Sequence, residues 1–268
     1  MTLKEALKFS TEYLEEKNID EADFKALCIV CSAAGITNSK FFSSTEEVDL
    51  NEILPLLKRI ENREPLQYVL GKWDFYESEF FVGEGVLIPR PETEELVELA
   101  IKEAEKFTSP VIYDLCAGSG CIGISVAKKL ESSTVFCIEK SEQAFEYLKQ
   151  NAKGIDNVNI FIADICDDID LPKADIIISN PPYIKTDDIN SLEKELFFEP
   201  RMALDGGQDG LDFYRIIKDK YTSKLNDCGV FLFEIGNEQG NDIISLFGDA
   251  EIIKDIYGND RIARIIKE

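Results

Sequence analysis

The sequence predicts an α/β protein with a mostly parallel sheet, preceded by a small helical domain and a β-rich linker. Apolar residues in the first part recur at helical spacing, and the middle is rich in aromatic and β-branched residues. From residue 110 onward, strand-like runs alternate with helix-like runs. Such alternation favours a parallel sheet covered on both faces, because each helix returns the chain to the same end of the next strand. We therefore expect a helical domain over 1–65, a linker over 66–90 and the main domain over 91–268.

The first 65 residues show three apolar stripes with spacings of three and four, which is typical of amphipathic helices. The stripes are Leu3-Ala6-Leu7-Leu14, Phe24-Leu27-Cys28-Cys31 and Ile53-Leu54-Leu57-Ile60. Asp20 and Asp49 each stand where an N-cap is expected. No chemistry is evident in this domain, so a packing role and a substrate-docking role are both open.

The linker leads from the helical domain to the main domain. Its two runs over 68–73 and 75–82 are rich in aromatic and β-branched residues and are predicted to form a short β element. Arg90 then lies between two prolines, and a helix with acidic residues in its first turn is predicted over 92–107. The loop before that helix can face a site.

The main domain is predicted to contain five strands that alternate with helices and a closing hairpin. The strands are expected over 111–115, 135–139, 158–162, 175–179 and 230–234, the helices over 121–130, 142–152, 211–225 and 241–247, and the hairpin over 251–257 and 261–266. In such a sheet, ligands bind beyond the carboxyl ends of the strands near the point where the strand order reverses. Asp114, Glu139, Asp164 and Asn180 all fall at such strand ends.

Charge and composition limit the partners and the chemistry. The chain has 29 Lys and Arg against 52 Asp and Glu, which gives a formal net charge of −23. This charge repels phosphate backbones, so we expect no direct nucleic-acid partner. The chain has no histidine, which excludes an imidazole base, a histidine-dependent triad and a histidine metal ligand.

The cysteines and the hydropathy pattern indicate the cellular compartment. Seven cysteines are scattered through apolar runs, which is typical of reduced thiols. Cys28 and Cys31 form a C-x-x-C in a helical run without a second pair at metal spacing, so no metal site is expected. The first residues lack the apolar core of a signal peptide, and no apolar run approaches the roughly 20 residues of a membrane span. We expect a cytoplasmic monomer that makes no membrane contact.

The run I-I-I-S-N-P-P-Y, residues 176–183, is typical of a buried strand that ends in a loop carrying chemistry. Asn180 has a carboxamide oxygen and Pro181 has a carbonyl but no N–H, so two acceptors can converge on one NH2 group. Pro181 and Pro182 stiffen the loop, and Tyr183 adds a flat face for a planar group. The loop predicts binding of a planar amide or a base amino group, and a merely stiff turn is the alternative.

A glycine turn follows the first predicted strand of the main domain. Residues 114–123, D-L-C-A-G-S-G-C-I-G, contain a G-x-G-x-x-G, and Glu139 ends the next strand where it can bind ribose hydroxyls. A dinucleotide dehydrogenase is therefore a rival interpretation. Asp114, however, places a carboxylate where a pyrophosphate would lie, and this suits the ammonium end of S-adenosylmethionine better. Asp164 can accept a hydrogen bond from an adenine amino group or cap its own loop.

The tripeptide Gly206-Gly207-Gln208 lies in the acidic run D-G-G-Q-D-G before a predicted helix. Gly-Gly-Gln is also the catalytic tripeptide of peptide-release factors, but the surrounding acids would oppose insertion among RNA. We interpret the tripeptide as a turn.

Six motifs occur in order along the chain. They are R-E-P-L-Q-Y-V-L-G, L-I-P-R-P-E-T-E-E-L-V, D-L-C-A-G-S-G-C-I-G, N-P-P-Y-I, E-P-R-M-A-L-D-G-G-Q-D-G-L and F-E-I-G-N-E-Q-G. In this order and spacing they resemble the PrmC/HemK family, the protein-(glutamine-N5) methyltransferases that act on peptide chain release factors. The resemblance spans essentially the whole chain. N-P-P-Y alone is shared with nucleobase amino-methyltransferases, and its combination with I-P-R-P-E-T-E makes the resemblance specific.

The resemblance implies a class I S-adenosylmethionine-dependent methyltransferase fold, which is Rossmann-like with a mostly parallel seven-stranded sheet. It implies methyl transfer from S-adenosyl-L-methionine to the glutamine of a release factor's Gly-Gly-Gln loop, with S-adenosyl-L-homocysteine as the product. The N-terminal domain would help to dock the release factor. A DNA or RNA amino-methyltransferase, acting on adenine N6 or guanine N2, and a cofactor-binding protein without catalysis are the alternatives.

The resemblance also implies roles for individual residues. Asn180 and Pro181 would be catalytic and, with Pro182 and Tyr183, would hold the substrate amide. The methyl donor would be bound by Asp114, Cys116, Ala117, Gly118, Ser119, Gly120, Glu139, Asp164, Ile165 and Asn180. The family usually has glycine and threonine where Cys116 and Ala117 stand, and aspartate where Glu139 stands.

Overall fold

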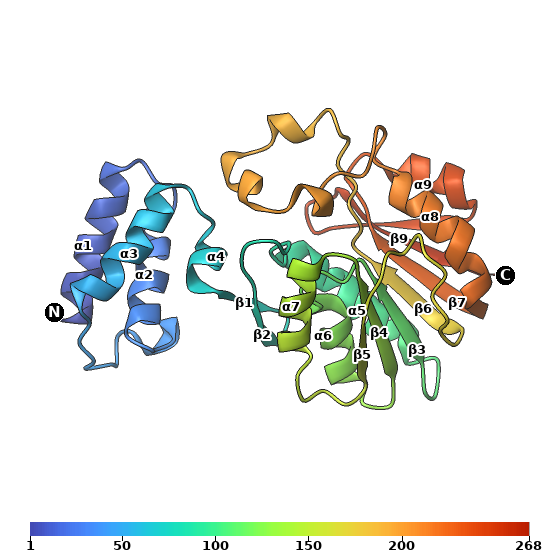
Figure 1. Ribbon diagram of the computed structural model, residues 1–268, viewed down its shortest axis with the longest axis horizontal. Coiled ribbons are helices and arrows are strands. Elements are labelled where there is room, and N and C mark those ends of the chain that lie inside the picture. Colours follow the sequence, from blue (N-terminus) through green and yellow to red (C-terminus); the bar gives the residue numbers. More distant parts are fainter. Residues whose placement is uncertain (268) are drawn as a thin grey trace. The chain divides into compact units, whose positions relative to one another are not determined.

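The computed structural model describes residues 1–267, which form two compact units (Figure 1). The first unit consists of Met1–Lys72 together with Glu193–Phe198, and the second of Trp73–Leu192 and the chain from Glu199 onward. The sequence did not predict that residues 193–198 would group with the first unit. The functional division expected at residues 65 and 90 is untested and stays a prediction.

The first unit is built from helices, as the apolar stripes predict. Its elements are α1 (Leu3–Glu16), α2 (Ala22–Ala33), the 3-10 turn η1 (Asn38–Lys40), α3 (Leu50–Glu61) and the short α4 (Leu66–Leu70). Leu14 and Ile53 are fully buried in it. The placement of Phe24 in a buried stripe is wrong: Phe24, near the start of α2, is exposed, whereas Cys28 and Cys31 of the same stripe are buried.

The two predicted helix caps have different outcomes. The carboxylate of Asp49 accepts a hydrogen bond from the backbone N–H of Asn51 at 2.9 Å and caps α3. Asp20 does not cap α2. The N-cap residue there is Glu21, which has a left-handed φ of 53° and makes no side-chain cap.

The linker contains less β structure than predicted. Strands form over Lys72–Phe75 (β1) and Ser78–Phe81 (β2), but the strand expected from residue 68 is wrong, because Leu66–Leu70 is helical. The guanidinium of Arg59 donates to the carbonyl oxygens of Tyr68 and Val69 at 2.9 and 3.2 Å. These tertiary hydrogen bonds satisfy carbonyls at the end of the short helix and override the local β propensity.

The second unit is built around a seven-stranded sheet. Its strands are β3 (Val111–Leu115), β4 (Thr134–Glu139), β5 (Val158–Ile162), β6 (Ala174–Ser179), β7 (Leu225–Glu234), β8 (Ala250–Lys254) and β9 (Asp260–Ile266). The order is β5-β4-β3-β6-β7-β9-β8, and only β9 pairs antiparallel to its neighbours. The predicted mostly parallel sheet and closing hairpin are confirmed.

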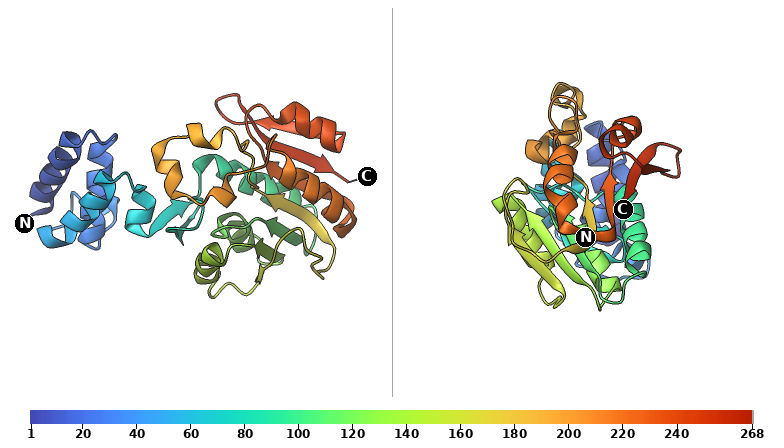
Figure 2. Two further views of the ribbon diagram at one scale, coloured as in Figure 1. Left: turned by 45° about the horizontal axis from the view of Figure 1, so that its top comes forward. Right: turned by 90° about the vertical axis from the view of Figure 1, so that its right-hand side faces the viewer.

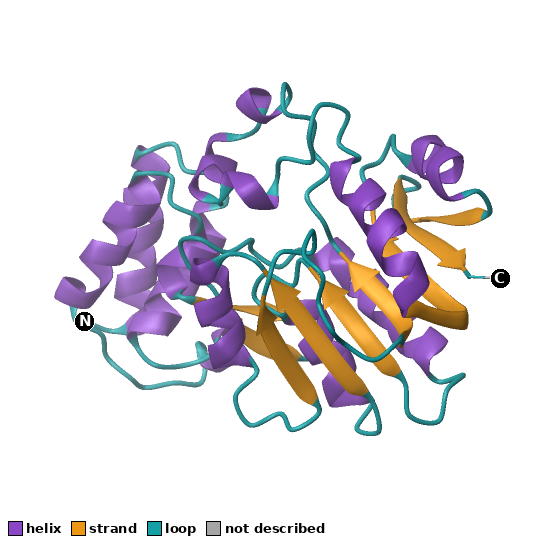
Figure 3. Cartoon of the chain, turned by 45° about the vertical axis from the view of Figure 1, so that its right-hand side comes forward, coloured by secondary structure: helices purple, strands orange, loops and turns teal. Residues whose placement is uncertain are grey.

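Helices cover both faces of this sheet (Figures 2 and 3). One layer holds α5 (Glu94–Ala104), α6 (Cys121–Lys129) and α7 (Glu142–Asn151), and the other holds α8 (Asp212–Tyr221) and α9 (Gly240–Phe247). Side chains alternate between the two cores, since Ile176 and Ile178 of β6 face the first layer and Ile177 faces the second. The helix predicted to run to residue 225 ends at Tyr221, because β7 begins five residues earlier than predicted.

The strand order reverses between β3 and β6, which lie side by side at the centre of the sheet. From β3 the chain crosses by α6 to β4 on one side, and from β6 it crosses by α8 to β7 on the other. The loops after β3 and β6 therefore diverge and leave a crevice at the carboxyl edge. This crevice positions the site.

We expect Ile178→Ala to lower the free energy of unfolding by about 2–5 kcal/mol, because it empties a fully buried position in the central strand. Urea unfolding followed by circular dichroism measures the change. The matched control is Ile256→Ala, at an 82% exposed position, which should stay within about 0.5 kcal/mol of the parent protein. Equal effects of the two substitutions would contradict the central position of β6.

Candidate active site

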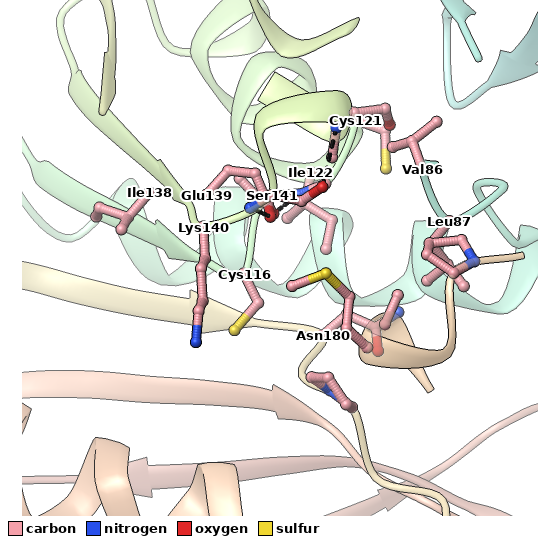
Figure 4. Close-up of a pocket in the computed structure, with 18 of the residues that line it drawn as sticks. Val86, Leu87, Cys116, Cys121, Ile122, Ile138, Glu139, Lys140, Ser141 and Asn180 are labelled. Carbon is pink, nitrogen blue, oxygen red and sulfur yellow. Dashed lines mark hydrogen bonds between the residues drawn. The ribbon is translucent and has the colours of Figure 1, made fainter. Parts of the chain in front are cut away.

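A pocket of about 350 Å³ opens at the carboxyl edge of the sheet, within the range expected for a small-molecule site (Figure 4). Its wall includes segments 85–90, 116–119, 138–141 and 163–165, with Asn180 and Pro182 from the loop after β6. Every lining residue belongs to the second unit. The predicted strand-end residues Glu139, Asp164 and Asn180 are thus brought together around one cavity.

Glu139 ends β4 and joins two loops of the pocket. One carboxylate oxygen accepts the N–H of Gly118 at 2.8 Å, and the other accepts the N–H of Ser141 at 2.6 Å. Burial raises the pKa of Glu139, and these backbone N–H groups oppose the rise. Each carboxylate oxygen keeps a further lone pair, so Glu139 can accept hydrogen bonds from two vicinal hydroxyls of a ligand.

Asp114 lies beneath the glycine turn and does not line the pocket. One oxygen accepts the N–H of Gly123 at 2.8 Å, and the other has no hydrogen-bond partner among residues 1–267. A Cβ at Gly123 would come within 2.9 Å of the Asp114 carboxylate, so this glycine permits the close approach of helix α6 to the strand. Burial raises the pKa of Asp114 to about 7.

The turn after β3 holds the residues that depart from the usual family pattern. Cys116, where the family usually has glycine, adopts a left-handed φ of 60°. Cys116, Ala117, Gly118 and Ser119 line the pocket, whereas Gly120 lies outside the wall as the N-cap of α6. Burial raises the pKa of the Cys116 thiol, so the side chain acts as a small neutral wall group.

Asp164 and Ile165 line the pocket beyond β5. Asp164 accepts the N–H of Cys166 at 2.9 Å and forms an ion pair of 2.6 Å with Lys140. The hydrogen bond from Lys140 lowers the pKa of Asp164 and keeps it ionised. Asp164 therefore caps its loop, as one of the two interpretations expected, and its ionised carboxylate is an acceptor at the pocket wall.

The N-P-P-Y loop presents Asn180 and Pro182 to the pocket, while Pro181 and Tyr183 are not part of its wall. The Asn180 Nδ2 atom lies 3.4 Å from Thr93 Oγ1, to which it donates. No residue in 1–267 donates a hydrogen bond to the Asn180 side-chain oxygen or to the Pro181 carbonyl. Both acceptors predicted from the sequence are thus unused within the described chain.

Two other motifs hold this loop. Gln239 of α9's N-terminal turn donates from Nε2 to the carbonyl oxygens of Tyr183 and Gly210 at 3.2 and 3.0 Å. Gly210 has a φ of 77°, and a Cβ there would come within 2.4 Å of the Tyr183 carbonyl oxygen. The run D-G-G-Q-D-G is therefore a turn that packs on the N-P-P-Y loop, as interpreted from its composition.

The sequence reasoning missed several residues that support the site. Glu234 at the end of β7 accepts hydrogen bonds from Thr93 and Tyr183, and Glu199 accepts the N–H of Ile88 and pairs with Arg90. Both acids are buried. Glu234 directly follows the apolar run V-F-L-F. An acidic residue at the end of such a run could have indicated a buried carboxylate.

The comparisons with known proteins decide the family. The model of the Methyltransferase small domain matches residues 94–210, and that of the PrmC N-terminal domain matches residues 5–71. The chain is 38% identical to a release factor glutamine methyltransferase of Thermodesulfovibrio yellowstonii, over 87% of this chain and 88% of that one. It is 35% identical to one of Bacillus cereus, over 98% of both chains, and 34% identical to one of Geobacter sulfurreducens, over 97% and 95%.

The chain belongs to the release factor glutamine methyltransferase family. The resemblance inferred from the six motifs is confirmed, and so is the methyltransferase fold. Within residues 1–267 no helix is long and apolar enough to cross a membrane. The same residues contain no cluster of Cys, Asp and Glu side chains suited to a metal ion.

The pocket of this family member fits S-adenosylmethionine. Glu139 offers acceptor lone pairs that a diol can use, and Asp164 and Ile165 line the same cavity. The unpartnered oxygen of Asp114 lies beneath the turn and favours a positive charge near it. Apolar wall residues such as Leu87 and Ile122 suit the uncharged parts of the molecule (Figure 4).

We expect Glu139→Gln to weaken binding of S-adenosylmethionine roughly 10- to 100-fold, because a hydrogen bond to a charged group contributes about 1.5–3 kcal/mol. Isothermal titration calorimetry measures the affinity. Glu146→Gln, at an exposed position on α7, is the matched control and should leave affinity unchanged. An unchanged affinity of the Glu139 variant would contradict the ribose assignment.

Asp114 should give the ligand-free protein a measurable pH dependence. Its folded pKa of about 7 lies above the ordinary value of 3.8, so between these values the folded state binds more protons than the unfolded state. Stability from this group is therefore lost as pH rises from about 4 to about 7, by at most about 1.4 kcal/mol per pH unit. Asp114→Asn lacks the titration, so urea unfolding at several pH values should show the parent protein losing stability relative to it. Parallel stability curves would contradict the raised pKa.

Proposed function

We propose that this chain transfers a methyl group from S-adenosyl-L-methionine to the side-chain amide nitrogen of the glutamine in the Gly-Gly-Gln motif of peptide chain release factors. The product of the methyl donor is S-adenosyl-L-homocysteine. The names of the curated relatives and the two matching family models support the proposal. The observation that carries it is the side chain of Asn180, which keeps a free carboxamide oxygen at the wall of the methyl-donor pocket.

The cofactor-binding set follows from the pocket geometry and the resemblance. Glu139 holds the ribose hydroxyls, Asp164 and Ile165 hold the adenine, and the turn from Cys116 to Gly120 with Asp114 beneath it holds the methionine portion. Asp114 and Gly120 act without lining the pocket themselves. Asn180 borders both the cofactor and the substrate.

The catalytic proposal rests on orientation. An amide nitrogen is a weak nucleophile because its lone pair is delocalised, so it must be aimed at a strong electrophile. When bound, S-adenosylmethionine supplies such an electrophile as a methyl group on positively charged sulfur. The oxygens of Asn180 and Pro181 accept the two amide hydrogens, Pro182 stiffens the loop, and the ring of Tyr183 packs on the amide plane.

No histidine is present to act as a base, and none is required early in the reaction. The amide proton becomes acidic only once the N–C bond forms and the C–S bond breaks, so it can pass to water after methyl transfer. The chain's own residues therefore bind and orient the amide, and Asn180 and Pro181 are the catalytic residues.

The proposal also covers the partner of the protein and its cellular setting. The helical domain over residues 1–65 helps to dock the release factor, and the protein acts as a cytoplasmic monomer without direct nucleic-acid contact. The net charge of −23 supports a protein partner rather than a phosphate backbone. An amino-methyltransferase of DNA or RNA, the rival use of N-P-P-Y, becomes an outcome of the test.

The test uses labelled S-adenosylmethionine with four acceptors in parallel: a release factor, its Gly-Gly-Ala variant, DNA and RNA. We expect label on the intact release factor alone. Label on nucleic acid would overturn the proposal in favour of the base methyltransferase. Cofactor binding without transfer to any acceptor would indicate a binding protein instead.

We expect Asn180→Ala to lower kcat roughly 30- to 1,000-fold, because it removes a hydrogen bond of about 2–4 kcal/mol in the transition state. Affinity for S-adenosylmethionine should change much less. Methyl transfer to the release factor and calorimetry measure the two effects. Asn241→Ala, at an exposed position on α9, is the control; near-parent turnover by the Asn180 variant would exclude its catalytic role.

A further inference from the structure

A buried polar chain links the end of β7 to the side chain of Asn180. The Thr93 hydroxyl donates to one oxygen of Glu234 at 2.6 Å, and the Tyr183 hydroxyl donates to the other at 3.3 Å. Thr93 in turn accepts the Nδ2–H of Asn180 at 3.4 Å. Glu234 and Thr93 are 3% and 2% exposed, so water does not compete for these contacts.

The hydrogen bonds in this network have a fixed donor-to-acceptor direction, because the network ends at the Glu234 carboxylate. An ionised carboxylate only accepts hydrogen bonds, and a threonine hydroxyl carries a single hydrogen. Burial raises the pKa of Glu234, and the two hydroxyl donors and the nearby positive charge of Arg261 oppose this rise. With its hydrogen committed to Glu234, Thr93 can offer Asn180 only a lone pair.

This direction decides which end of the Asn180 carboxamide faces the pocket. The two ends of an asparagine side chain have nearly the same shape, so packing alone cannot select one. An acceptor at Thr93 selects the NH2 end and leaves the oxygen for the substrate. The reversed amide would place an NH2 group against the substrate's own NH2 group, two donors without an acceptor between them.

We propose that Thr93 and Glu234 are positioning residues that set the orientation of the Asn180 carboxamide and thereby select an NH2-bearing substrate group. The inference rests on the proposed function, since it concerns how the same loop holds the amide. Thr93 borders the pocket and Glu234 does not, and in this proposal both act through Asn180. The Glu234 carboxylate accepts hydrogen bonds from Thr93, in the turn before α5, and from Tyr183, in the loop after β6, and so links these two segments.

The test compares Thr93→Val, which keeps the shape but removes the hydroxyl, with Thr93→Ser, which retains it. We expect Thr93→Val to lower kcat for methylation of a release factor roughly 10- to 100-fold. KM for the release factor and affinity for S-adenosylmethionine should stay within about threefold. Thr93→Ser should recover most of the parent rate, which a purely structural loss would not explain.

A double-mutant cycle with Asn180→Ala tests whether the fall in kcat caused by Thr93→Val acts through Asn180. If Thr93 acts through Asn180, Thr93→Val should add less than about twofold to the loss already caused by Asn180→Ala. Glu234→Gln supplies a second variant, since its amide can donate to Thr93 and release the hydroxyl hydrogen toward Asn180. We expect a similar fall in kcat, and circular dichroism checks that each variant folds.

The outcomes separate this inference from the proposed function. If the parent protein transfers no methyl group to a release factor, the proposed function fails. If the parent is active and Thr93→Val keeps its kcat within about twofold, or costs as much in the Asn180→Ala background as in the parent, the positioning inference is overturned. A Glu234→Gln variant with the parent kcat would overturn it as well.

Discussion

The pairing of β3 with β6 at the centre of the sheet is the constraint on which the site depends. Because the chain leaves these neighbours in opposite directions, the loops that follow them separate at the carboxyl edge. The glycine turn after β3 forms one side of the pocket and the N-P-P-Y loop after β6 forms the other. In the proposed function, the methyl donor and the amide are bound by loops that follow adjacent strands.

Buried carboxylates turn this crevice into a defined site. Glu139 ties the loop after β3 to the start of α7, and Glu234 ties the loop after β6 to the turn before α5. Asp114 holds the N-terminus of α6 against the sheet. Each charge is costly to bury, and each is held by backbone N–H or hydroxyl donors. Loss of one partner would therefore disturb a loop as well as a contact.

The sequence predicted the features that depend on neighbouring residues. Buried strand runs, the glycine turn and the N-P-P-Y loop are local patterns. Of the four strand-end residues expected at the ligand site, Glu139, Asp164 and Asn180 line the pocket, whereas Asp114 does not. The sequence could not predict α4, whose carbonyls are bonded by Arg59, because that hydrogen bonding is tertiary. It also missed the contact of Thr93 with Glu234, which joins residues 141 positions apart.

The central claim is that the loop after β6 presents a protein amide to the methyl donor. Its most direct test is to incubate the protein with S-adenosylmethionine and a release factor, and then to locate the added methyl group by tandem mass spectrometry. The account predicts one methyl group on the side-chain nitrogen of the glutamine in Gly-Gly-Gln. A methyl group on another residue, or none on a folded release factor with the cofactor bound, would contradict it.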